Sequence, residues 1–255
     1  MKNIMGIVEY DGSNYYGWQK QPDKPTVQGE IERVLSILLG EKIHIRGASR
    51  TDRGVHAKAQ VFNFRYEGKV KLKELLRRLN SILPDTIAIK RLRYADEDFD
   101  ARRSAMGKLY EYRIVTVKSP LTRKFSWYLK AKLDFDLLNE LARQITGEHN
   151  FYAFSREPGE KIKTVCPIYE AYWRRARGGL IFRIRGGFFL RGMVRSLVGA
   201  MVRVATGKLT KDQFLEMLCH GKRIYNYPVA PPEGLTLVKV YYKPESTKGK
   251  TNSTG

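Results

Sequence analysis

Apolar helical stripes in both halves of the chain, set between β-branched strand segments, constrain the fold most strongly. In the first half a helix is predicted from about Thr26 to Leu39, because apolar side chains recur at helical spacing and Gly40 follows. A second helix is predicted up to Pro84. The predicted order is β-α-β-β-α-β. Its strand segments are residues 3–10, 42–48, 58–66 and 87–94, and its second helix is residues 72–83.

The second half has the same order of elements without a residue-level repeat. A helix stopped by Gly147 follows the first strand, and a hairpin turning at Gly178 and Gly179 comes next. Thr210 and Gln213 have the spacing of a capping box at the start of a short helix. The predicted strands are residues 108–117, 169–177, 179–185 and 235–242, and the predicted helices are residues 134–147, 188–207 and 210–218.

This order predicts an α+β protein of two ferredoxin-like units, with mixed, mostly antiparallel sheets and helices on one face. We expect the units to meet near residues 96–108, with an N-terminal domain over residues 1–103 and a C-terminal domain over residues 104–243. Residues 244–255 carry almost no apolar side chains, so a disordered tail is expected there.

The charge of the chain indicates a polyanionic partner. Among 255 residues, 47 Lys and Arg stand against 26 Asp and Glu, which gives a formal net charge of +21. Phosphates favour clustered cations through counterion release, so nucleic acid is the leading partner class. The 15 tyrosines favour RNA, because aromatic faces among cations suit unstacked bases. A basic protein without such a partner is the alternative.

Several features predict a cytoplasmic protein. Cys166 and Cys219 lie far apart without metal-ligand spacing, so neither a disulfide framework nor a zinc site is expected. The first residues have too short an apolar run for a signal peptide and resemble a first strand. No run approaches membrane-spanning length, so no membrane association is expected.

Asp52 is the first candidate functional residue. It lies in the segment "SRTDRGVHA", where Gly54 permits a tight bend, and an Asp in such a position is most often part of a turn. Arg50 and Arg53 flank it, and neighbouring cations favour the ionised carboxylate. An ionised carboxylate can act as a nucleophile or a base, which makes Asp52 a catalytic candidate.

Arg191 and Arg195 are candidates on the long helix. They are four residues apart, so we expect both on one helix face, at the border of the apolar stripe beside Val198 and Val202. A partly desolvated arginine there requires an acidic partner. The alternative is an arginine whose head reaches into water.

Tyr110 and Tyr112 are two residues apart in a strand and share one face, where they could stack on a base. Tyrosine in a strand more often serves packing. His56 lies near Asp52, but no Ser or Cys nucleophile completes a triad, so a structural histidine is favoured. The carboxylates are not clustered, which argues against a metal site and two-metal phosphoryl chemistry.

Two other function classes are alternatives to an enzyme that acts through Asp52. A binding module of two RNA-recognition units, such as an RNA chaperone or a ribosomal protein, would explain the charge and the tyrosines. It leaves the aspartate between two arginines unexplained. A metal-dependent nuclease predicts clustered acids that the sequence lacks.

Several ordered motifs resemble those of the tRNA pseudouridine synthases of the TruA family. They are "YDGSNYYGWQKQPDKPTVQGE", "RGASRTDRGVHA", "LYEYRI", "FFLRGMVRSLVG" and "APPEGLTL", and the resemblance runs from about Ile4 to Tyr242. It implies the pseudouridine synthase fold and an isomerase of tRNA uridines. Two positions depart from the family pattern: Ser49 replaces the usual glycine and Arg53 a frequent alanine, so loop shape and phosphate contacts can differ locally.

The resemblance also implies roles for single residues. Asp52 would be the catalytic aspartate, Tyr110 would stack on the target uracil, and Arg195 would pair with Asp52. Leu235 would line the uracil pocket, and Arg50 would fill the gap left by a flipped nucleotide. We expect Arg53 and Arg191 to contact the tRNA.

The implied reaction breaks the N1–C1′ bond of uridine, rotates the uracil and rejoins it through C5, so no cofactor and no metal are expected. The implied substrates are uridines at positions 38, 39 and 40 of tRNA, on the 3′ side of the anticodon stem-loop. The implied assembly is a homodimer in which both subunits line each site.

Overall fold

Residues 1–156 and 163–243 are described by the computed structural model. They form five α-helices and a sheet of ten strands. The tail predicted over residues 244–255 lies outside the described residues.

The first half contains the predicted order of elements. Helix α1 begins after Thr26, whose side chain accepts a hydrogen bond from the Gly29 N–H, and ends at Gly40, which has a φ of 73°. The bounds are β1 (Lys2–Tyr10), α1 (Val27–Leu39), β2 (Arg46–Gly47), β3 (His56–Tyr66), α2 (Leu72–Ile82) and β4 (Ile87–Ala95).

The strand predicted at residues 42–48 is wrong over most of its length, since only the two residues of β2 pair with β3. The cause lies in side chains of α1. Ser36 accepts a hydrogen bond from the Ile43 N–H at 2.9 Å, and Glu32 accepts one from the Ile45 N–H at 3.1 Å. These backbone groups are therefore satisfied by the helix and not by a neighbouring strand.

The second half also follows the predicted order and adds two short strands, β6 and β7, that the sequence patterns did not predict. Thr210 and Gln213 form the predicted capping box at the start of α5. The bounds are β5 (Gly107–Val115), β6 (Trp127–Tyr128), α3 (Phe135–Gln144), β7 (Gly147–Asn150), β8 (Val165–Ala176), β9 (Gly179–Gly186), α4 (Met193–Ala205), α5 (Lys211–His220) and β10 (Leu235–Tyr241).

Helix α4 begins at Met193, five residues later than predicted, and this overturns the expectation that Arg191 and Arg195 share a helix face. Gly192, at the N-cap, has a φ of 72°, which a right-handed helix cannot include. Arg191 therefore lies in the loop before the helix, and Arg195 lies in its first turn.

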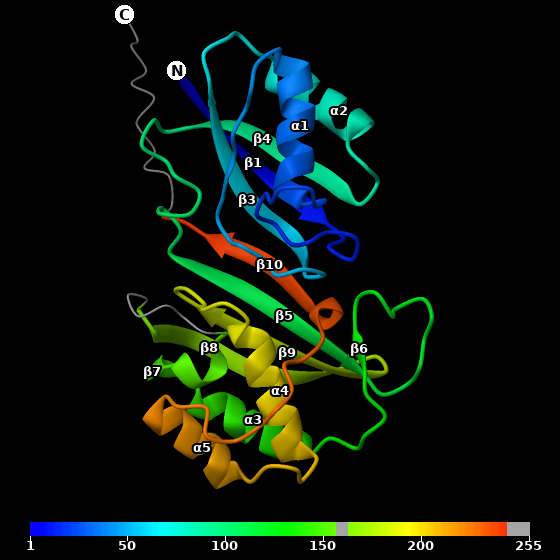
Figure 1. Cartoon of the computed structure of the whole chain (residues 1–255), viewed down its shortest axis with the longest axis vertical. Coiled ribbons are helices and arrows are strands. Elements are labelled where there is room, and N and C mark those ends of the chain that lie inside the picture. The colour runs from blue at the N-terminus through cyan, green and yellow to red at the C-terminus, as the bar shows by residue number, and fades with distance from the viewer. Residues whose placement is uncertain (157–162, 244–255) are drawn as a thin grey trace, which may run out of the picture.

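One sheet runs through both halves, in the order β4-β1-β3-β10-β5-β9-β8-β7, with β2 on β3 and β6 on β5. Within each half the strands lie in the order fourth, first, third and second, as in a ferredoxin-like unit, and the predicted fold class is confirmed. Figure 1 shows α1 and α2 over the strands of the first half and α3, α4 and α5 over those of the second.

The last strand, β10, connects the two halves of the sheet. It pairs antiparallel with β5, where Leu237 lies opposite Tyr110, and parallel with the start of β3, where Leu237 lies opposite Ala57. Residues close to the C-terminal end of the described chain thus lie between the halves (Figure 1). Leu237 is fully buried in the common core.

Truncating Leu237 tests how much this central strand contributes. Leu237→Ala should lower the free energy of unfolding by about 2–5 kcal/mol, because a buried methyl pair is lost and a cavity remains. Urea unfolding followed by circular dichroism measures the change. Leu121→Ala is the matched control, since Leu121 is 91% exposed and its truncation should leave stability unchanged. Equal stability of both variants and the parent would contradict a structural role for β10 in joining the halves.

Candidate active site

A cavity of about 1270 Å³ lies where the two halves meet. Its wall comes from the loop before β3, the start of β5, the segment before α4 and the start of β10. The seven residues expected to act in catalysis or in tRNA binding all line it, although they come from segments up to 185 residues apart. They are Arg50, Asp52, Arg53, Tyr110, Arg191, Arg195 and Leu235.

Gln60, a fully buried residue of β3, holds the backbone of the loop that carries Asp52. The Gln60 side chain donates to the Ser49 carbonyl at 2.7 Å and accepts from the Ser49 N–H at 3.1 Å. Both backbone groups of one residue are thus held by a single amide. This double contact sets the start of the loop.

Thr51, directly before Asp52, is a second anchor of the loop. Its hydroxyl lies 2.7 Å from the Tyr10 hydroxyl, and its carbonyl accepts a hydrogen bond from the Trp18 N–H at 3.1 Å. Gly17, beside Trp18, has a φ of 96°, and a Cβ there would lie 2.6 Å from the Thr51 carbonyl oxygen. The segment before α1 therefore packs directly on the backbone of the Asp52 loop and restricts where that backbone can lie.

Asp52 and Arg195 form an ion pair, with Arg195 Nη1 3.1 Å from Asp52 Oδ2. Their side chains are 19% and 9% exposed, so water screens the pair weakly. Arg195 Nε also donates to the Ala230 carbonyl at 2.7 Å, and the Ala230 N–H donates back to the Arg195 carbonyl at 3.1 Å. The guanidinium is therefore held at two ends, and it presents a fixed positive charge to the carboxylate.

Tyr110 lines the cavity next to this pair. Its hydroxyl lies 2.7 Å from the Ser49 hydroxyl, and its ring meets the Phe189 ring edge to face, with centroids 5.2 Å apart. Burial raises the pKa of the Tyr110 phenol to about 12, with a smaller contribution from the Asp52 charge. The phenol is therefore neutral at physiological pH. The serine that departs from the family pattern thus gives Tyr110 a hydrogen-bonding partner.

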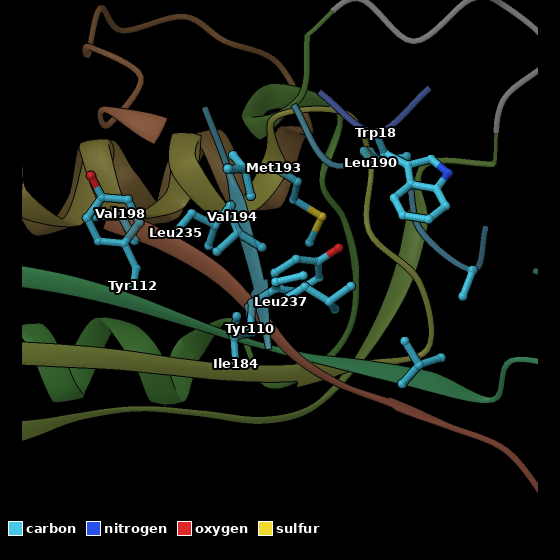
Figure 2. Close-up of a cluster of buried hydrophobic side chains, with 14 of the residues drawn as sticks. Trp18, Tyr110, Tyr112, Ile184, Leu190, Met193, Val194, Val198, Leu235 and Leu237 are labelled. Carbon is cyan, nitrogen blue, oxygen red and sulfur yellow. The ribbon is translucent and has the colours of Figure 1, made fainter. Parts of the chain in front are cut away.

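Apolar side chains surround Tyr110 on the side of α4 and β10. Figure 2 shows Met193, Val194, Leu235 and Leu237 gathered around its ring. Leu235 is 6% exposed and lines the cavity from the first residue of β10. An apolar wall beside a neutral aromatic ring suits a planar, weakly polar group such as a nucleobase.

Three of the cavity's arginines, Arg50, Arg53 and Arg191, are exposed at the surface. Arg50 and Arg191 are exposed, and Arg53 stacks over the Tyr16 ring with its guanidinium carbon 4.3 Å from the ring centroid. The structure thus separates a paired, buried arginine from three surface arginines around it. All three are exposed and make no ion pair with an acid among the described residues, so they can meet phosphates, Arg53 while it lies over Tyr16.

Five further cations line the same cavity, and the sequence patterns did not single them out. The signal that could have found one of them is strand alternation, since Lys108 lies two residues before Tyr110 on the same face of β5. The others come from loops, where no periodicity predicts direction. The five residues are Arg102, Lys108, Arg123, Lys124 and Arg156.

Tyr112 and His56 have structural surroundings. Tyr112 is fully buried and donates its hydroxyl to the Pro231 carbonyl at 2.8 Å, so it packs inside the protein and leaves Tyr110 as the tyrosine of this pair at the cavity. His56 accepts a hydrogen bond from the Gly12 N–H at 3.1 Å, and its ring contacts the Phe125 ring at a tilt of 40°. Burial lowers the pKa of His56, which keeps its imidazole neutral.

The described residues contain no group of three or more His, Cys, Asp or Glu side chains placed to hold a metal ion. Among the same residues, no helix has the length and apolar character that crossing a bilayer requires.

Comparison with known proteins places this arrangement in a family. The sequence profile described as tRNA pseudouridine synthase matches residues 7–102 and 141–243, which include Asp52, Arg195 and Leu235. The chain belongs to the tRNA pseudouridine synthase family. It is therefore an isomerase of the class that converts uridine to pseudouridine.

Individual tRNA pseudouridine synthases match nearly end to end. The tRNA pseudouridine synthase A of Chlorobaculum tepidum is 42% identical over 242 residues, covering 94% of this chain and 98% of the relative. That of Acetivibrio thermocellus is also 42% identical, over 245 residues, covering 95% and 100%. A solved Cbf5-Nop10-Gar1 complex aligns with a TM-score of 0.37 and 11% identity over 93% of this chain and 59% of that chain, too weakly for a structural argument.

Arg195→Lys tests the two-ended contact of this synthase. A lysine ammonium cannot reach both Ala230 and Asp52 in the geometry of a planar guanidinium, so one charge-assisted hydrogen bond is lost. We expect pseudouridine formation to slow by about ten- to hundredfold, the equivalent of one such bond. Single-turnover rates on unmodified tRNA measure this. Arg177→Lys, at the exposed turn between β8 and β9, is the control and should retain the full rate. A full rate in Arg195→Lys would contradict the account.

Proposed function

We propose that this synthase converts uridines at positions 38, 39 and 40 of tRNA, in the anticodon stem-loop, to pseudouridine, with Asp52 as the catalytic residue. The observation that carries the proposal is the Asp52 carboxylate, paired with Arg195 at 3.1 Å and lying beside Tyr110 in one cavity. The positions within the stem-loop rest on the resemblance to the TruA family.

The target base leaves the stem in this proposal. A nucleotide paired in a helix cannot bring its glycosidic bond to a partly buried carboxylate, so it must be flipped out. The flipped uracil stacks on Tyr110 and contacts Leu235, and the neutral phenol adds no charge to the site. Arg50, exposed at the rim, fills the gap that the nucleotide leaves, because a planar cation can stack between bases.

The chemistry requires one carboxylate and no external reactant. The N1–C1′ bond breaks, the uracil rotates, a C5–C1′ bond forms, and the proton lost from C5 is balanced by the proton gained at N1. Asp52 acts by attack on C1′, by attack on C6 or by removal of the 2′ proton. Arg195 holds the carboxylate in place in each case, since its guanidinium is itself fixed by the Ala230 carbonyl.

Charge supports the tRNA contact. The rim arginines Arg53 and Arg191 bind phosphates in this proposal, within a chain of net charge +21. In this proposal the enzyme acts in the cytoplasm. It also acts as a homodimer whose two subunits both line the stem-loop site, as the resemblance implies.

A binding module without catalysis makes a different prediction for the same protein. Unmodified tRNA transcript incubated with the parent protein and with Asp52→Ala, followed by carbodiimide mapping, distinguishes the two readings. The proposal requires pseudouridine with the parent protein and none with Asp52→Ala. Binding by both proteins without any modified uridine would favour the binding module. Modified uridines only outside the anticodon stem-loop would refute the proposed position.

Asp52→Asn separates chemistry from binding. The substitution keeps size but removes the charge, so turnover should be abolished while tRNA affinity stays nearly intact, because phosphates are bound by the surrounding cations. Filter binding and single-turnover assays on the same preparation measure both quantities. A large loss of affinity in Asp52→Asn would count against this division of labour.

The two Tyr110 variants separate stacking from hydrogen bonding. Tyr110→Leu removes the aromatic face, and we expect the single-turnover rate to fall by about ten- to hundredfold, the value of one base stacked on an aromatic ring. Tyr110→Phe keeps the ring and loses only the contact with Ser49, so it should lie between the parent and Tyr110→Leu. Equal rates for the parent and Tyr110→Leu would refute the stacking role.

A further inference from the structure

We propose that Lys108 and Arg102 form a binding subsite for one backbone phosphate of the RNA, adjacent to the nucleotide that stacks on Tyr110. The subsite rests on the proposed function in one respect, the position of the flipped uridine on Tyr110. Its chemistry, two cations facing one diester anion, depends only on the structure.

The geometry of β5 places Lys108 at the right distance. Lys108 and Tyr110 are two residues apart on one strand and both line the cavity, so their side chains leave the same face about 7 Å apart. A phosphate next to a nucleotide stacked on Tyr110 lies at a separation of this order. Arg102 reaches the same cavity from the segment that precedes β5.

These two cations lack an acidic partner. The Lys108 ammonium and the Arg102 guanidinium make no hydrogen bond or ion pair within residues 1–156 and 163–243. Glu111, the acid closest to Lys108 in sequence, pairs with Arg183 at 3.1 Å. Asp100, the acid closest to Arg102 in sequence, is also bound to other groups. Its carboxylate accepts the backbone N–H groups of Arg102 and Arg103 at 2.9 Å and pairs with Arg46 at 2.8 Å.

The arrangement is unfavourable without an anion. Lys108 is partly buried, and burial followed by repulsion from Arg102 lowers the pKa of its ammonium to about 8. A partly buried ammonium beside an exposed guanidinium, with no acid to compensate either charge, is unfavourable in the free protein. A phosphate bound between them would remove the repulsion and satisfy both donors, which explains why both cations face the cavity.

Binding of an anticodon stem-loop RNA at several salt concentrations tests the subsite, with Lys108→Met, Arg102→Met and the parent protein. We expect Lys108→Met to weaken binding about tenfold at moderate salt, as for a lost charge-assisted contact. The slope of log K against log salt should fall by about 0.7–0.9, the value for one lost phosphate contact. Lys108→Arg should restore both. Lys90→Met is the matched control. Lys90 lies on the outer strand β4, where it pairs with Glu9, so this variant should bind RNA like the parent protein.

A neutral linkage in the RNA identifies the phosphate. Methylphosphonate placed on the 5′ or the 3′ side of the target uridine should weaken binding to the parent protein at one of the two positions. It should cause no further loss with Lys108→Met. Equal losses in both proteins at both positions, or an unchanged salt slope in Lys108→Met, would overturn the proposal.

Stability distinguishes binding from a structural role. Without RNA, Lys108→Met should unfold at the same or a higher temperature than the parent, because an uncompensated buried charge is removed. A lower unfolding temperature with an unchanged salt slope would overturn the proposal. The measured quantity is affinity and not turnover, so failure of pseudouridine formation alone refutes the proposed function and leaves the subsite standing.

Discussion

The ion pair between Asp52 and Arg195 is the contact on which the site depends. It joins a loop of the first half to the first turn of α4 in the second half, residues 143 apart in the sequence. Each partner is fixed by its own surroundings, Arg195 by Ala230 and the Asp52 loop by Gln60. A carboxylate held in this way keeps one position against a fixed guanidinium, which is the preorganisation that chemistry at a nucleoside requires.

The fold makes this contact possible through its last strand. Because β10 lies between β3 and β5, the sheet is continuous and the two halves cannot move apart without breaking it. Leu235 at the start of β10 faces the cavity, and Ala230, five residues earlier, holds Arg195. The segment that closes the sheet is thus also the segment that positions the site. Packing of the sheet and placement of the Asp52–Arg195 pair are therefore coupled.

Local patterns in the sequence predicted the elements but not how they meet. The end of α1 at Gly40 and the capping box at Thr210 depend on neighbouring residues, and both were predicted correctly. The prediction of a strand at residues 42–48 was wrong because side chains of α1 accept hydrogen bonds from its N–H groups. The predicted start of α4 was wrong because Gly192 adopts a positive φ. The contact of Asp52 with Arg195 and the cavity position of Lys108 with Arg102 depend on tertiary structure, which periodicity does not encode. The ordered family motifs indicated the first of these contacts; the second emerged only from the folded chain.

The most direct measurement of the central claim is a crystal structure of Asp52→Asn bound to an anticodon stem-loop. The account predicts a uridine turned out of the stem, its uracil on the Tyr110 ring and its ribose C1′ facing the amide at position 52, with Arg195 still bound to Ala230. A stem-loop bound with every base stacked inside the stem, or a flipped base lying away from position 52, would contradict it.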